Sequence, residues 1–173
     1  MKKGKLNRIT DVEGVLVGHK TICSGTHQTG VTFIRTAEDV FHQKLACGCS
    51  ILNGFGKTTG LPQIMELGTL ESYICLTNTL NVGVVQQALV DIMVKENEDL
   101  TSVNVVVGEC NDGYLNSIRD CVVTKEDVYD AYADCKKEFE LGSVGAGRGI
   151  VLKCQVVLDQ VQESLRLMEI HIL

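Results

Sequence analysis

The sequence predicts a single α+β domain in which helices and strands form separate layers. Short β-branched runs bounded by glycine indicate strands, and two segments with helical features indicate helices, but the two types do not alternate as a doubly wound sheet requires. The chain has 173 residues, about the length of one domain and enough to bury a substantial core. With 45% hydrophobic and 22% charged residues, the composition is that of a globular protein.

Short apolar runs with turn residues at their ends are typical of strands. The expected strands are Ile9–Val17, Gly30–Arg35, Leu45–Asn53, Tyr73–Asn78 and Val103–Val107, with a polar loop joining the first two. Glycine-rich or polar turns follow two of them, at Gly54–Gly60 and Thr77–Thr79. Loops after strands commonly carry binding groups, so these turns are candidate ligand contacts.

Two segments are expected to be helical. Between Val82 and Lys95 the apolar residues recur at positions 84, 85, 88, 89, 92 and 93, which is the spacing of a helix face turned to a core. Thr124 followed by Asp127 forms a capping box, which predicts a second helix over about Lys125 to Glu138, with Gly142 as the stop.

Charge and cysteine content exclude several classes of function. The 22 acidic and 16 basic residues give a net charge of −6, with no basic cluster beyond Met1–Lys5, which argues against nucleic-acid binding. No apolar run approaches the roughly 18 residues that span a bilayer, and no secretory signal follows the basic start, so no membrane association is expected. Eight cysteines without a C-x-x-C pair are expected to be reduced thiols of a cytoplasmic protein.

Several segments resemble known binding motifs but lack a residue that the motif requires. Gly54–Gly60 ends like a phosphate loop but has Ile51 where the leading glycine belongs, and the Gly145–Gly149 segment has Ile150 where a dinucleotide fingerprint needs glycine. The histidines at 19, 27, 42 and 171 lack metal-ligand spacing, so neither a metal nor an organic cofactor is expected. Asn116 has two open interpretations, a donor to a developing oxyanion or a simple turn cap.

Taken in order, six segments resemble the L-aminopeptidase/D-esterase family, which includes the DmpA-type and β-peptidyl aminopeptidases. The segments are ITDVEGVLVGH, GVTFI, LNGFGKTTGLPQIMELGTLES, LTNTLNVGVVQQALV, NDGYLN and GSVGAGRG, within about residues 8 to 150. The resemblance implies an N-terminal-nucleophile-like α-β-β-α sandwich, here incomplete. It also implies a precursor that cleaves itself before a Ser or Thr, whose hydroxyl then attacks amide or ester bonds near the N-terminus of small peptides.

The resemblance also assigns residues. Asn116 is expected in the oxyanion hole, and Asn53, Lys57 and Asn78 are expected to contact substrate. Arg148 stands where the family has its Ser or Thr nucleophile, and a guanidinium neither attacks a carbonyl nor loses its proton near neutral pH. Many aminopeptidase relatives carry Glu at position 57. Lys57 would repel a substrate ammonium and favour a carboxylate or carbonyl, or it is simply solvated at the rim.

The sequence after residue 150 departs from the family pattern. Residues 1–150 correspond to the α-chain-like part of a self-processing aminopeptidase, whereas residues 151–173 form a non-family tail. A shifted reading frame of Gln155–Leu173 permits GGIGSSSRIVEINGDTHI, which is similar to the family's continuation. We therefore expect that a small deletion near residues 150–155 changed the frame and truncated the product, leaving a tail that packs poorly.

These expectations define two functions from different classes. The first is a self-processing serine or threonine aminopeptidase by family that is inactive in this chain because position 148 is Arg. The alternative is a catalytically dead binding or assembly subunit that pairs with intact copies. In both cases the expected partners are a small peptide or amide substrate and further copies of the chain in a homo-oligomer.

Overall fold

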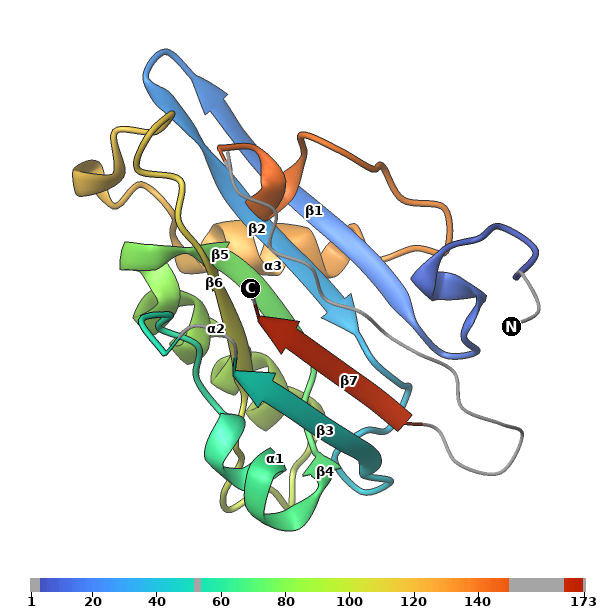
Figure 1. The fold of residues 1–173 in the computed structure, drawn as a ribbon. Helices are drawn as coiled ribbons and strands as arrows, with labels where there is room; N and C mark the ends of the chain where they lie inside the picture. Colours follow the sequence, from blue (N-terminus) through green and yellow to red (C-terminus); the bar gives the residue numbers. More distant parts are fainter. Residues whose placement is uncertain (1–3, 52–53, 150–166, 173) are drawn as a thin grey trace.

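The computed structural model describes residues 4–51, 54–149 and 167–172, which form two sheets and a layer of helices (Figure 1). The larger sheet has four strands in the order β1-β2-β5-β6, and the smaller has three in the order β4-β3-β7. The strands are β1 Leu16–Ser24, β2 His27–Arg35, β3 Leu45–Ile51, β4 Thr69–Leu70, β5 Ile74–Asn78, β6 Val106–Cys110 and β7 Leu167–Ile172. The helices are α1 Leu61–Leu67, α2 Val82–Glu96 and α3 Lys125–Ala133.

Strand β2 lies inside the larger sheet and is buried on both faces over Thr29–Ile34. It pairs antiparallel with β1 from Leu16↔Arg35 to Ser24↔His27, and its later half pairs antiparallel with β5. Only Gly25 and Thr26 separate β1 from β2, and Gly25 has a φ of 55°, a conformation that glycine adopts without strain. The hairpin is therefore tighter than the polar loop predicted from sequence.

Helices α2 and α3 cover one face of the larger sheet (Figure 1). Val85 and Leu89 of α2 and Val128 of α3 are fully buried there against Val31 and Phe33 of β2. The helix predicted from apolar spacing at 82–95 is confirmed, and Thr124 and Asp127 form the predicted capping box of α3. Burying these side chains contributes about 2 kcal/mol each, which makes this the main core of the domain.

The opposite face of the larger sheet packs against the smaller sheet. Ile34, Ile74 and Val106 of the larger sheet meet Cys47 of β3 and Leu70 of β4 in a second buried cluster. Residues of α1 complete this cluster, and α1 contacts both β3 and β4. The described residues thus supply a helix layer and two facing sheets, in agreement with the expected sandwich.

The last described segment, β7, lies in residues 151–173, which the sequence predicts to be a non-family tail. It runs parallel to β3, from Ala46↔Leu167 to Ile51↔Ile172. The expected poor packing of the tail concerns side chains outside the described residues.

Several boundaries differ from the predictions, and hydrogen bonds explain three of the differences. Ile9–Val17 is not one strand, because the Asp11 carboxylate accepts the backbone N–H groups of Leu6 and Arg8 and holds a 3-10 turn at Ile9–Asp11 before β1 begins. Strand β6 begins at Val106 rather than at Val103, because the backbone N of Asn104 bonds to the Glu71 carboxylate instead of entering the sheet.

The third difference is the length of α3, and one short helix was not predicted. Helix α3 ends at Ala133, since the backbone of Lys136 exchanges hydrogen bonds with Val17 of β1 and so leaves the helix direction. Helix α1 was missed, although Pro62 at its start and Gly68 at its end are common helix boundaries.

No helix among the described residues is long and apolar enough to cross a membrane. Every cysteine that the structure describes is a free thiol, and Cys47, Cys75 and Cys110 are buried.

Gly18 of β1 is required by the close approach of α3. A Cβ at this position would lie 2.0 Å from the carbonyl O of Ala131 and 2.7 Å from the backbone N of Cys135. Gly18→Ala should therefore lower the free energy of unfolding by about 3 kcal/mol in urea titrations, the upper range for overpacking. Gly83→Ala is the control, since its added Cβ meets nothing within 4 Å. Equal stability of the two variants would contradict this packing.

Candidate active site

Three of the residues assigned from sequence gather at one edge of the larger sheet. Strands β5 and β6 are parallel and end together at Asn78 and Cys110, and the antiparallel β2 begins beside them. The NDGYLN turn follows β6, and a 3-10 turn at Gly145–Gly147 lies over the start of β2. The structure therefore brings the chain segments of Asn78, Asn116 and Arg148 to the same edge.

Asn116 is held in a single amide orientation. It is 6% exposed, its Oδ1 accepts the backbone N–H of Gln28 at 3.0 Å, and its Nδ2 donates to the Asp112 carboxylate at 3.2 Å. Because a backbone N–H must meet an oxygen, the contact with Gln28 settles which end of the amide is the donor. One of the two Nδ2 protons is committed to Asp112, and the second is available to another acceptor.

Arg148 contacts the same residue as Asn116. Its Nε donates to Oε1 of Gln28 at 2.8 Å, and its Nη2 donates to Sγ of Cys23 at 3.0 Å. Gln28 therefore links the two positions, through its backbone N to Asn116 and through its side chain to Arg148. The next residue, Gly149, is tightly enclosed, since a Cβ there would lie 2.0 Å from the carbonyl O of Gln28.

Hydroxyl groups of the sheet fix the turn that precedes Arg148. The backbone N of Gly145 donates to Thr21 Oγ1 at 2.8 Å, and that of Ala146 donates to Thr32 Oγ1 at 3.1 Å. Gly145 has a φ of 54°, and a Cβ there would lie 2.5 Å from Thr32 Oγ1. The glycine at this position is therefore needed for both its conformation and its close approach.

His19 supports the same turn as a neutral ring. Its Nε2 lies 3.1 Å from the carbonyl O of Glu140, and its Nδ1 lies 3.0 Å from Thr32 Oγ1. A carbonyl only accepts, so Nε2 carries the proton and Nδ1 accepts the Thr32 hydroxyl. Burial lowers the pKa of His19 below its usual value, which keeps the ring neutral. The prediction that this histidine is structural agrees with these contacts.

Asn78 is 2% exposed and bonded at both ends of its amide. Its Nδ2 donates to Thr29 Oγ1 at 3.1 Å, and its Oδ1 accepts the backbone N–H of Asn81 at 3.0 Å. These contacts join the end of β5 to β2 and begin the 3-10 turn Thr79–Asn81 that leads into α2.

Lys57 contacts a residue of its own loop. Its Nζ donates to the carbonyl O of Phe55 at 2.8 Å and lies 3.8 Å from the centroid of the Phe55 ring, and both side chains are exposed. This arrangement matches the alternative of a lysine solvated at the rim. Asn53 lies outside the described residues.

Gln28, Cys23, Thr32 and His19 were not predicted as parts of this cluster. They lie more than 80 residues from the motifs that they contact, so no local sequence pattern indicates these contacts. A cavity of about 170 Å³ adjoins the turn, lined by His19, Thr32, Leu76, Cys110, Phe139, Glu140, Leu141, Gly142, Val144, Ala146 and Gly147. It is smaller than ordinary ligand pockets, which measure about 300 Å³ or more.

Among the described residues, no group of three or more His, Cys, Asp or Glu side chains is placed to hold a metal ion.

Comparison with known proteins identifies the class as the Ntn hydrolase fold of the aminopeptidases. The PH0078 protein of Pyrococcus horikoshii has a TM-score of 0.82 and 44% identity over 86% of this chain and 46% of its own. The L-aminopeptidase D-Ala-esterase/amidase of Ochrobactrum anthropi, described as a variant of the Ntn hydrolase fold, has a TM-score of 0.77 and 30% identity over 87% of this chain and 46% of its own.

Sequence comparison gives the particular family. The peptidase family S58 matches residues 7–154, so the chain belongs to that family of hydrolases. The β-peptidyl aminopeptidase BapA of Sphingosinicella xenopeptidilytica is 35% identical over 161 residues, which cover 86% of this chain and 40% of BapA. The chain thus spans less than half the length of the relatives it matches.

The contacts of His19 predict how stability depends on pH. The unfolded ring has its usual pKa and the folded ring a lower one, so below about pH 6.5 the unfolded state binds more protons and stability falls. The urea midpoint should therefore drop between pH 7.5 and pH 5.5. In His19→Gln this part of the drop should disappear. An identical pH dependence in the variant would refute the neutral, buried role of His19.

Proposed function

We propose that residues 1–150 are the α-chain-like part of a self-processing aminopeptidase for small peptides, and that the chain as it stands neither cleaves itself nor turns over substrate. The observation that carries this proposal is the contact of Asn116 and Arg148 with the same residue, Gln28. A hydrolase needs its nucleophile and its oxyanion donor on either side of one reacting carbonyl. The shared contact with Gln28 supports placing the two positions close together.

In this proposal Asn116 stabilises the charge that develops on the carbonyl oxygen. Its free Nδ2 proton is the donor, and the contacts with Gln28 and Asp112 keep the amide from rotating. Removing one donor of this kind typically costs 10²- to 10³-fold in kcat. Asn78 keeps the end of β5 in place, and Asn53 and Lys57 are proposed to lie along the substrate path.

In this proposal the residue at position 148 determines whether the chain can cleave itself and form an acyl-enzyme. In the proposed ancestral reaction a Ser or Thr hydroxyl at this position attacks the preceding peptide carbonyl. The acyl group moves from nitrogen to the hydroxyl oxygen, which forms an ester and frees the α-amine that later serves as base. Water then hydrolyses the ester, releases the upstream carboxylic acid and regenerates the hydroxyl. Arg148 has no hydroxyl, and its guanidinium stays protonated near neutral pH, so no acyl-enzyme forms.

The alternative is a binding or assembly subunit that keeps the cluster without the nucleophile. It is favoured by the closeness of the contacts around Arg148, where Gln28 and Cys23 both accept from the guanidinium. Such a subunit would associate with intact copies of the family protein and form a homo-oligomer on its own.

The first test of the proposal is the mass of the purified protein. We expect one species at 18.9 kDa and no release of product from aminoacyl amides above the rate in buffer. Two fragments separated at the Gly147–Arg148 bond would overturn the proposal. Arg148→Lys should behave in the same way, because it also lacks a hydroxyl. Co-purification of the chain with an intact family protein would support the assembly subunit over an inactive chain without a binding role.

The second test concerns the tail. The family match ends at residue 154, which supports the proposal that a frame change near residues 150–155 replaced the family sequence. Resequencing the gene should show that one or two nucleotides restore a frame encoding GGIGSSSRIVEINGDTHI. A gene that reads through this region without such an alternative frame would end this part of the proposal.

A further inference from the structure

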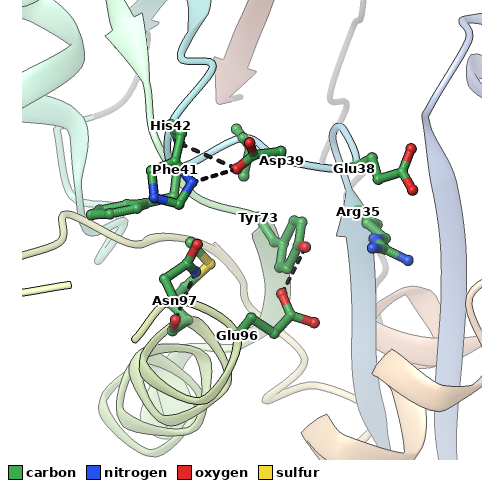
Figure 2. Close-up of a pocket in the computed structure, with 10 residues that line it drawn as sticks. Arg35, Glu38, Asp39, Phe41, His42, Tyr73, Glu96 and Asn97 are labelled. Atoms are coloured by element: carbon green, nitrogen blue, oxygen red, sulfur yellow. Dashed lines mark hydrogen bonds and ion pairs between the residues drawn. The ribbon is translucent and has the colours of Figure 1, made fainter. Parts of the chain in front are cut away.

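A second pocket lies at the other end of β2, between the end of that strand and the end of α2 (Figure 2). It has a volume of about 410 Å³, within the range of ordinary ligand sites. Its lining is Arg35, Glu38, Asp39, Val40, Phe41, His42, Tyr73, Met93, Glu96 and Asn97. Gln28 and Arg35 are seven residues apart on an extended strand, or about 23 Å, so this pocket is separate from the candidate active site.

A carboxylate in this pocket is held in place by two phenols. The hydroxyl of Tyr73 donates to Glu96 Oε2 at 2.8 Å, and the hydroxyl of Tyr132 donates to the other oxygen of the same carboxylate. Burial and the contact with Glu96 raise the pKa of Tyr132 to about 12, so this phenol remains a donor. Tyr73 is 2% exposed, and its pKa is raised for the same reasons. The two hydroxyls therefore hold the Glu96 carboxyl group in one position.

A second carboxylate is positioned across the pocket. Asp39 Oδ1 lies 2.7 Å from His42 Nδ1 (Figure 2). His42 Nε2 also lies 3.1 Å from Asp99 Oδ1. Glu38 stands exposed at the rim. Three carboxylates therefore line a space that also contains one guanidinium, and the lining carries both signs of charge.

Arg35 has unused hydrogen-bonding capacity. Its guanidinium lies 5.8 Å from the centroid of the Tyr73 ring, and its Nε is buried with no hydrogen-bond partner in the part of the chain that the structure describes. A buried donor without a partner costs about 1–3 kcal/mol, and a carboxylate is its strongest acceptor. The rest of the wall is apolar, formed by Val40, Phe41, the Tyr73 ring and Met93.

We propose that this pocket binds a free α-amino acid with an apolar side chain, as a zwitterion. Arg35 receives the ligand carboxylate, the carboxylates of Glu96, Asp39 and Glu38 surround its ammonium, and the apolar wall receives its side chain. The surplus of acidic groups disfavours acidic amino acids. This site goes beyond the proposed function, because none of its residues belongs to the cluster around Arg148.

The test is a calorimetric titration of the full chain with three probes. L-Leucine carries both charges, L-leucine amide lacks the carboxylate, and N-acetyl-L-leucine lacks the ammonium. We expect L-leucine to bind at least tenfold more tightly than either analogue. No binding of L-leucine, or equal binding of L-leucine and its amide, would overturn the proposal.

Variants test which residues of the pocket bind the carboxylate and the ammonium of the ligand. Arg35→Gln should reduce the affinity for L-leucine to that for the amide, whereas Arg119→Gln, the same change at an exposed arginine near the other end of the sheet, should leave it unchanged. If Arg35→Gln does not fold, the exposed Glu38→Gln serves instead and should weaken L-leucine but not N-acetyl-L-leucine. Unchanged affinity in the folded variant would contradict the assignment. Because binding is measured on the uncleaved chain, the result is independent of any activity at position 148.

Discussion

Strand β2 is hydrogen-bonded along both edges and buried on both faces, and this constraint places both sites of the protein. Helices α2 and α3 pack on one face through Val31 and Phe33, and the second sheet packs on the other through Ile34. A strand enclosed in this way cannot slip by one residue, because the slip would exchange the side chains of the two faces. Gln28 at its start and Arg35 at its end are therefore fixed relative to everything around them.

At the first site this constraint holds Asn116, the proposed oxyanion donor, close to Arg148, the proposed position of the lost nucleophile. Asn116 owes its orientation to the backbone of β2, and the turn before Arg148 owes its position to Thr21 and Thr32 of the hairpin. Neither depends on a hydroxyl at position 148. The scaffold of the site can therefore persist without its nucleophile, since Gln28 and Cys23 accept the guanidinium instead.

Family membership and the size of the chain have to be considered together. Peptidase family S58 matches most of the chain, yet the chain spans less than half of its relatives. The cavity beside the turn measures about 170 Å³, less than a peptide needs. A peptide site would need walls beyond those that the described residues provide. The larger pocket at Arg35 has a volume of about 410 Å³ and carries a proposal of its own.

The sequence by itself determined the class of fold, the periodic helix 82–95, the capping box of α3 and the ordered motifs that identify the family. These features depend on local preferences and on spacing along the chain, which a sequence displays directly. It also showed that position 148 is Arg, because that is a matter of identity and not of geometry.

Only the tertiary structure decided the end of α3 and the contacts that form the two sites. It shortened α3 through the pairing of Lys136 with Val17. It joined Gln28 to Asn116 and Arg148, and it opened a charged pocket around Arg35. Each of these results rests on contacts between residues far apart in the chain, and such contacts arise only when the sheet and its covering layers assemble.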